Sequence, residues 1–268
     1  FREYLIFHSI PFDAVTVHTP SRGRILKAFE AYLQEGGFPE VIATNDPIIK
    51  RQLLQTYYGT IFYKDILERY AIKARSVLDR MMGYALDSYA GLFSISAFEK
   101  MLKSAGLSGS KRTIANYLHY LEEAFFLVLV EKFSYSPRAR AMNARKAYLI
   151  DTGFAGLGVP FSENRGRLLE NMVAVELYRR KQECFFHKER QECDFILKSG
   201  TKPVLAMQVC WEMTSQNEAR ELKGLLEALT KWKIKDGLIL TANQETERVF
   251  EGRKIKIQPA WKWALRQE

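Results

Sequence analysis

The first part of the chain carries apolar residues at helical spacing. Within residues 24–33, five of them hold i, i+3 and i+4 positions: Ile25, Leu26, Phe29, Tyr32 and Leu33. This spacing predicts an amphipathic helix, which the two glycines and the proline of residues 36–40 end. Asp46 and Pro47 predict the cap and first turn of another helix, whose tyrosines and phenylalanines fall at core-packing positions. Residues 1–75 are therefore expected to form a helical region.

Two short helices joined by a turn are predicted next. Ser96 and Glu99 have the spacing of a capping box at the start of the first helix. Ser110 is expected to cap the second helix, residues 111–123. Two short helices with a glycine-containing turn between them are typical of the helix-turn-helix motif.

Strand-like runs at residues 127–130 and 147–150 flank a basic segment, residues 137–146, which has four basic side chains and no acid. A helix-turn-helix followed by a basic hairpin indicates a winged helix, expected over residues 76–150. The second helix of such a module lies in the major groove of DNA, and basic side chains of the hairpin contact phosphates. The residues predicted to bind nucleic acid are Lys111, Arg112, Asn116, Arg138, Arg140, Arg145 and Lys146, with His119 on the same side of the helix as Asn116.

Strands and helices follow one another from residue 151 to residue 268. This order favours a mixed α/β sheet flanked by helices. The predicted helices cover residues 167–182 and 217–232, with a short one after Pro259, and the predicted strands cover residues 193–197, 204–210, 237–241 and 254–257. The chain is thus predicted to be an α/β multidomain protein with three parts, residues 1–75, 76–150 and 151–268.

Four residues of the last part are candidates for a metal-dependent catalytic site. Glu170 is an acid in a predicted helix, Asp194 is an acid in a predicted strand, and Gln208 and Cys210 end the next strand. Mg²⁺ prefers hard oxygen ligands, and a metal together with a lysine can activate water for attack on a phosphodiester. Glu170 and Asp194 fit the metal-ligand role. Gln208 offers only a neutral carbonyl oxygen, and Cys210 cannot supply a cation.

Other charged residues near these four leave alternatives open. Lys188, Lys198 and Lys223 are near enough in sequence to replace a missing lysine, and no pattern selects one of them. Glu176 falls on the apolar face of the predicted helix, where an acid needs a partner. It is expected either to support Glu170 or to pair with the arginines at 179 and 180.

The formal net charge of +9 favours an anionic partner such as nucleic acid. Two alternatives remain, because many winged helices mediate protein contacts and a run of Arg and Lys is often only a solvated surface. The three cysteines, Cys184, Cys193 and Cys210, are odd in number and lie in apolar runs, which favours reduced buried thiols over disulfides. Their spacing argues against a zinc site.

No apolar stretch approaches the about 20 residues of a membrane span, and no signal peptide heads the sequence. The cytoplasm is therefore the expected compartment, without a membrane partner. The sequence begins with Phe1 and not with methionine, so a fragment of a longer protein is expected.

The order of several segments resembles the C-terminal portion of the bacterial and archaeal AAA-type ATPases that end in a restriction-endonuclease-like module. The segments that carry the resemblance are residues 36–40, 96–123, 146–153, 169–173 and 255–263. The resemblance implies a P-loop ATPase core upstream, which would bind ATP; the sequence itself contains no nucleotide-binding motif. It also implies that residues 1–75 close the ATPase module and that residues 151–268 form the restriction-endonuclease-like domain.

Within that resemblance, Glu170 and Asp194 match the acids that hold Mg²⁺, while Gln208 and Cys210 stand at the positions of the second acid and the lysine. Gly166 and Glu170 also resemble the opening G-x-x-x-E of archaeal Holliday-junction resolvases. The departure at 208 and 210 favours a DNA- or partner-binding module with a catalytically degenerate site. A Mg²⁺-dependent nuclease or resolvase and a protein-docking or homo-oligomerisation module are the alternatives.

Overall fold

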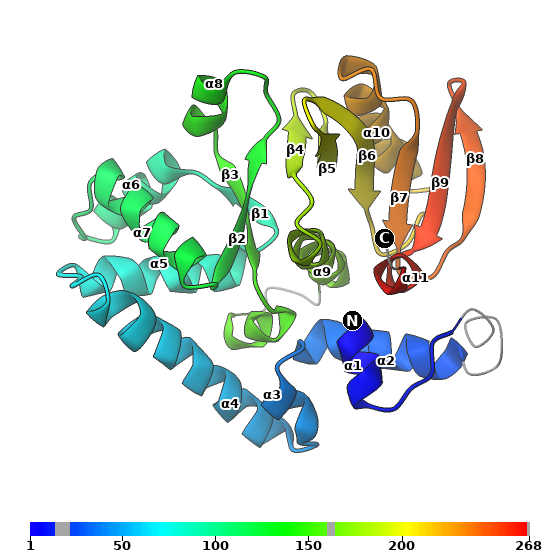
Figure 1. Ribbon diagram of the computed structural model, residues 1–268. Helices are drawn as coiled ribbons and strands as arrows, with labels where there is room; N and C mark the ends of the chain where they lie inside the picture. The colour runs from blue at the N-terminus through cyan, green and yellow to red at the C-terminus, as the bar shows by residue number, and fades with distance from the viewer. Residues whose placement is uncertain (14–21, 160–163, 267–268) are drawn as a thin grey trace. The chain divides into compact units, whose positions relative to one another are not determined.

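The computed structural model describes residues 1–13, 22–159 and 164–266 (Figure 1). The chain divides into two compact units. The C-terminal unit consists of Phe1–Leu33, Lys132–Tyr135 and Asn164–Glu268, and the middle unit consists of Gln34–Glu131 and Ser136–Glu163. The predicted boundaries at 75 and 150 thus fall inside the middle unit, and the first helices of the chain belong with its last part.

The middle unit is mainly helical and contains a small antiparallel sheet in the order β1-β3-β2. Its helices are α3 (Pro39–Ala43), α4 (Pro47–Thr60), the π-helical η2 (Ile61–Glu68), α5 (Arg75–Ser88), α6 (Ile95–Ser104), α7 (Lys111–Glu123), α8 (Pro137–Met142) and the 3-10 helix η3 (Thr152–Leu157). Its strands are β1 (Gly91–Phe93), β2 (Leu127–Lys132) and β3 (Arg145–Leu149). Asp46 caps α4 as predicted, accepting a hydrogen bond from the Ile48 N–H at 2.8 Å.

The predicted pair of helices is present, with one correction at its start. Ser110 caps α7 by accepting a hydrogen bond from the Thr113 N–H at 3.1 Å. The cap of α6 is Ser94 and not Ser96, because Ser94 still has extended backbone dihedrals and accepts from the Ala97 N–H. The helix therefore begins directly after β1, and the predicted capping box is wrong.

The basic segment between β2 and β3 is not a simple hairpin loop. The two strands pair antiparallel, with Val128 opposite Tyr148, as the strand-like runs predicted. Between them, Ser136 caps the short helix α8 by accepting from the Ala139 N–H. Proline at the first helical position favours this helix, which sequence reasoning did not identify.

A buried aspartate joins two of the segments that carry the family resemblance. Asp151 accepts hydrogen bonds from the backbone N–H groups of Gly37 and Gly153, both at 2.8 Å. Burial raises the pKa of Asp151 to about 6, while both backbone hydrogen bonds favour its ionised form. Gly36 has a φ of +80°, and a side chain there would overlap the Asp151 carboxylate. Glycine at position 36 is therefore required by this close approach.

The C-terminal unit contains a mixed six-stranded sheet in the order β4-β5-β6-β7-β9-β8. Its strands are β4 (Cys184–Lys188), β5 (Glu192–Ser199), β6 (Lys202–Val209), β7 (Gly237–Thr241), β8 (Thr246–Phe250) and β9 (Arg253–Pro259). Strand β7 runs parallel to β6 and to β9, and the other neighbours are antiparallel. The α/β class and the mixed sheet are thus confirmed, while β4 and β8 were not predicted.

Five helices belong to the described part of this unit. They are α1 (Arg2–Phe7), α2 (Arg22–Glu35), α9 (Arg165–Arg179), α10 (Glu218–Lys231) and α11 (Ala260–Leu265). Helix α10 contacts β5, β6 and β7, and α9 contacts β6 and α11. Phe133 extends the unit beside β4, donating its backbone N–H to the Phe186 carbonyl at 2.8 Å and packing on Trp232.

None of the helices in the described ranges combines the length and the apolar character that crossing a membrane requires.

Candidate functional site

The C-terminal unit contains a cavity of about 730 Å³ that all four predicted catalytic residues line. Glu170 comes from α9, Asp194 from β5, and Gln208 and Cys210 from the end of β6. The remaining lining residues are mostly polar and include Asn164, Arg167, Lys188, Arg190, Glu192, Trp211, Glu212, Arg220 and Glu221. Helix α9, strand β5 and the C-terminal end of β6 therefore bring these four residues together.

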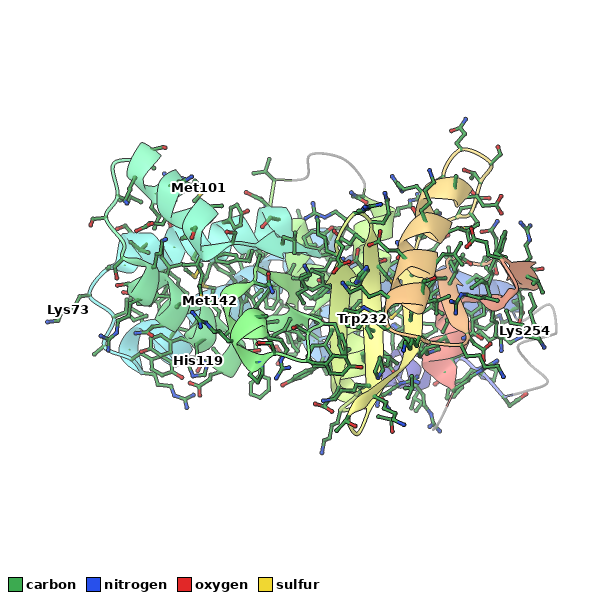
Figure 2. The ribbon with its side chains drawn as sticks, turned by 90° about the horizontal axis from the view of Figure 1, so that it is seen from above. Lys73, Met101, His119, Met142, Trp232 and Lys254 are labelled. Atoms are coloured by element: carbon green, nitrogen blue, oxygen red, sulfur yellow. The ribbon has the colours of Figure 1, made fainter. Side chains whose placement is uncertain are left out.

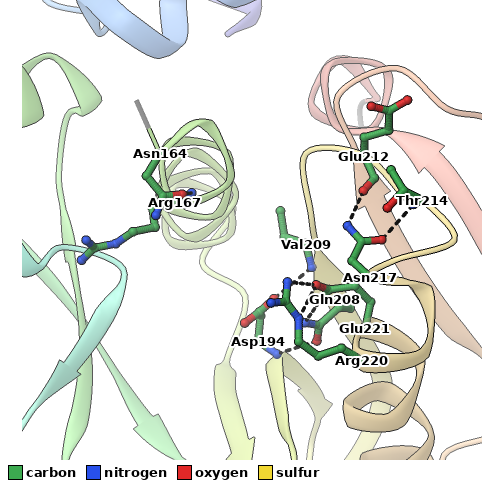
Figure 3. A network of polar contacts seen from close by, with 10 residues as sticks. All are labelled: Asn164, Arg167, Asp194, Gln208, Val209, Glu212, Thr214, Asn217, Arg220 and Glu221. Carbon is green, nitrogen blue, oxygen red and sulfur yellow. Dashed lines mark hydrogen bonds and ion pairs between the residues drawn. The ribbon is translucent and has the colours of Figure 1, made fainter. Parts of the chain in front are cut away.

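Gln208 uses both ends of its amide within the protein. Its Oε1 accepts from the Asp194 N–H at 3.3 Å, and its Nε2 donates to the Glu221 carboxylate at 2.8 Å. The Asp194 carboxylate accepts from the Val209 N–H at 2.9 Å. Figure 3 shows these contacts side by side across β5, β6 and the start of α10. Gln208 thus holds two carboxylate-bearing elements together, a role that its neutral amide can fill.

Sequence reasoning missed the acid and the cation that complete this network. Glu221 is only 4% exposed, and the 77% exposed side chain of Arg220 donates to it from Nε at 3.1 Å and Nη2 at 2.5 Å (Figure 3). Glu221 precedes Leu225 by one helical turn, which places it on the apolar face of α10. This position is the signal that would have identified it, as it identified Glu176.

Cys210 is a neutral thiol in this site. Burial, together with the carboxylates of Glu221 and Asp194, raises its pKa to about 12. A thiol is a poor nucleophile and a poor metal ligand compared with a thiolate. Cys210 therefore supplies no charge to the cavity at neutral pH.

The described residues do not include a ready set of metal ligands. Across residues 1–13, 22–159 and 164–266, no three His, Cys, Asp or Glu side chains are grouped so that they hold a metal ion. Two acids, Glu170 and Asp194, line the cavity as predicted, but the amide at position 208 is engaged by Glu221 and by the Asp194 backbone. The oxygen at position 208 that was predicted to face a metal is therefore already engaged by protein groups.

One of the three lysines considered lies at the site. Lys188 lines the cavity and pairs with Glu192 at 2.9 Å. Lys198 pairs with Glu183 at 3.0 Å, and neither Lys198 nor Lys223 is among the lining residues. Arg220, which the sequence did not single out, contacts the buried carboxylate of Glu221.

Glu176 does not support Glu170. It accepts from Arg179 at 2.6 and 2.9 Å and from Arg180 at 2.7 Å. Of the two interpretations offered from the sequence, pairing with the arginines is therefore confirmed.

The residues predicted to bind nucleic acid lie in the middle unit with unequal exposure. Lys111, Arg112, Asn116 and Arg138 are exposed. Arg140 and Arg145 are partly exposed and both pair with Glu131 at 3.5 Å. Lys146 is 1% exposed, because it lies in β3 with its side chain in the interior. Its assignment as a nucleic-acid contact is therefore withdrawn.

The Gln208 contacts allow a direct test. Replacing Gln208 by glutamate is expected to lower the free energy of unfolding by on the order of 2 kcal/mol at pH 7, since a carboxylate replaces the donor to Glu221. Two adjacent carboxylates share a proton more readily in acid, so the loss should shrink towards pH 5. Urea unfolding measures both values, with exposed Gln191→Glu as the control. An equal loss at the two pH values would contradict this account.

The fold and the site define an α/β protein of two units, one mainly helical with a small antiparallel sheet and one with a mixed sheet and a polar cavity. Residues 26–163 match the model of a family described as a domain of unknown function, DUF8612. This match covers just over half of the 268 residues, and the chain belongs to this family. Residues 165–263 match a second domain of unknown function, DUF4143, which is often found in AAA-ATPase-associated proteins.

Two relatives align with nearly all of the chain. The uncharacterized protein MJ1544 of Methanocaldococcus jannaschii is 32% identical over 277 residues, which cover 99% of this chain and 61% of that protein. An uncharacterized protein of Haemophilus influenzae is 27% identical over 244 residues, which cover 90% of this chain and 59% of that protein. The chain therefore spans about three fifths of the length of these curated relatives.

Proposed function

We propose that this chain is a DNA-binding module of an AAA-type ATPase and that α7 is its main contact helix. The observation that carries the proposal is the division of α7 into two faces. Lys111, Arg112 and Asn116 are exposed, while the opposite face, with Ile114, Tyr117, Leu118 and Leu121, is buried. A helix that follows a short turn and presents cations at its N-terminal end suits the major groove and its phosphates.

The ATPase connection is supported by the two comparisons. The domain matched by residues 165–263 is often found in AAA-ATPase-associated proteins. Both relatives extend well beyond the aligned part, which leaves room for an ATPase core in them. In this proposal, ATP binds to a domain outside this sequence.

The cavity of the C-terminal unit then serves binding and not phosphodiester cleavage. Gln208 is held at both ends, and the raised pKa of Cys210 keeps it uncharged. The chemistry of the family pattern needs a second acid and a cation at these two positions. The winged-helix and restriction-endonuclease-like assignments belong to the same proposal.

One observation favours a Mg²⁺-dependent nuclease as the second candidate. Glu170 and Asp194 line one cavity, as a hydrolytic site of this kind requires. Incubation of DNA with the protein and Mg²⁺ or Mn²⁺ tests this function, and Asp194→Ala serves as the matched variant. Metal-dependent cleavage that is lost in Asp194→Ala would replace the binding proposal for this unit.

Removing two cations from α7 tests DNA binding. The variant Lys111→Ala with Arg112→Ala is expected to bind duplex DNA more weakly and to make the slope of log affinity against log salt shallower by about two, because each phosphate contact contributes roughly one. Fluorescence anisotropy at several salt concentrations measures both quantities. The variant Lys254→Ala with Lys256→Ala removes the same charge from exposed positions of β9 and should bind like the parent protein. A DNA affinity that does not depend on salt concentration would contradict the proposal. An equal loss of affinity in the two double variants would also contradict it.

A further inference from the structure

A second cavity lies in the middle unit, beside the helix proposed to contact DNA. Its volume is about 320 Å³. It is formed where the end of β1 and start of α6, the side of α7 and the segment from α8 to β3 meet. The lining residues are Phe93, Ser94, Ile95, Ser96, Ala115, Leu118, His119 and residues 141–145. Figure 2 labels two of them, Met142 and His119.

The walls combine apolar surface with a few hydrogen-bonding groups. Met142 is 81% exposed, so its thioether is available to an aromatic ligand. Ser94 and Ser96 supply hydroxyl groups. Asn143 adds an amide to the lining, and its Nδ2 donates to the Ala139 carbonyl at 2.6 Å. Apolar walls with a polar edge match a flat heteroaromatic ring that carries its own donors and acceptors.

Cations lie on the elements that form this cavity. Arg145 lines it, and its guanidinium is also 3.5 Å from the Glu131 carboxylate. Ala115, another lining residue, follows Lys111 by four positions and Arg112 by three on α7, which places those cations on the same side of the helix. A ligand whose ring enters the cavity would therefore keep an attached phosphate close to positive charge.

We propose that this cavity holds an unpaired nucleobase of the bound nucleic acid. The inference rests on the proposed DNA binding and adds a preference within it. A base inside a paired stack cannot present its ring to a protein pocket, whereas an extrahelical or single-stranded base can. The chain should therefore favour DNA that contains an unpaired base over a fully paired duplex of the same length.

Two duplexes that differ by one extra unpaired base test this preference on the full chain. Base–side-chain stacking gives a difference of roughly tenfold in affinity, and the bulged duplex should bind more tightly by that factor. A 2-aminopurine at the unpaired position should change its fluorescence on binding. Met142→Ala is expected to reduce the preference and the fluorescence change while leaving affinity for the paired duplex unaltered. Val159→Ala, an exposed truncation in the same unit, is the control.

The outcomes separate this inference from the proposed function. Equal affinity for the paired and the bulged duplex would overturn the nucleobase pocket and leave the DNA-binding proposal intact. A preference that Met142→Ala and Asn143→Ala both retain also overturns it, because the pocket is then not its source. Equal binding of the two duplexes, together with binding of an acidic peptide that contains phenylalanine and is lost in Met142→Ala, would overturn the inference and identify a protein partner instead. Absence of salt-dependent binding to any DNA overturns both proposals.

Discussion

Replacing Glu176 by alanine is expected to lower the free energy of unfolding by about 3–5 kcal/mol, because it removes one partner of a buried ion pair. The side chain of Glu176 is 5% exposed and that of Arg180 is 9% exposed. Arg180 also donates to the backbone carbonyls of Trp263, Ala264 and Arg266 around α11. Loss of the carboxylate leaves the guanidinium buried without its anion and weakens the attachment of α11 to α9.

The pH dependence of stability gives the same prediction a second measurement. Burial disfavours the ionised form of Glu176, but hydrogen bonds from Arg179 and Arg180 hold its pKa below the ordinary value of a glutamate. The unfolded chain therefore binds more protons than the folded one in the acidic range. The contribution to stability is present above the unfolded pKa and is lost as the pH falls through the folded pKa. Glu176→Ala should flatten this acid limb of the curve.

Urea unfolding from pH 7 into this acidic range measures both effects, with Glu183→Ala as a matched control. Glu183 pairs with Lys198 at 3.0 Å but is 59% exposed, and exposed ion pairs contribute less than about 1 kcal/mol. Similar losses in the two variants would show that burial of the Glu176 pair is not what stabilises the unit.

The sequence predicted those elements whose apolar spacing is regular or whose caps are strong. Helices α7 and α10 and strands β5 to β7 fall where their patterns placed them. Strand β8 was missed because its residues are almost all exposed, and an edge strand without a buried face shows no alternation. Strand β4 was missed because it has only five residues and its apolar residues are consecutive. Such a short run shows no alternation of apolar and polar positions.

The division into units could not be predicted, because it depends on long-range contacts. Helices α1 and α2 look like part of the helical region that follows them, yet they pack with the C-terminal unit. The four residues Lys132–Tyr135 begin with the last residue of β2, and they return to that unit through Phe133 and its contacts with Phe186 and Trp232. No local pattern encodes such a crossing.

The sequence predicted which residues lie together at the candidate site, but it did not predict the hydrogen bonds between them. Glu170, Asp194, Gln208 and Cys210 line one cavity as expected. The explanation for glutamine at 208 came only from the structure, which sets its amide against buried Glu221. A carboxylate at position 208 would face another carboxylate there. Glutamine at position 208 is thus consistent with the packing between β6 and α10.

Gly224 lies where α10 approaches β5 most closely, and the turn between β4 and β5 depends on that approach. A Cβ at position 224 would overlap the backbone carbonyl of Glu192. One turn further along α10, Glu227 accepts from the Gln191 N–H and contacts His187 Nε2 at 2.8 Å. Arg190 of this turn lines the cavity, as do Lys188 and Glu192 at its two ends. Helix α10 therefore fixes the position of one wall of the candidate site.

Replacing Gly224 by alanine is therefore expected to lower the free energy of unfolding by about 3 kcal/mol, since backbone must move to relieve the overlap. The control is Gly83→Ala in the interior of α5, where the added methyl meets nothing within 4 Å. Helix propensity alone should make that variant more stable by about 0.5–1 kcal/mol. The same substitution is thus expected to change the free energy of unfolding in opposite directions in the two helices. Urea unfolding measures both changes. A stabilised Gly224→Ala protein would mean that α10 and β5 lie further apart than described and that the cavity wall is not fixed by this contact.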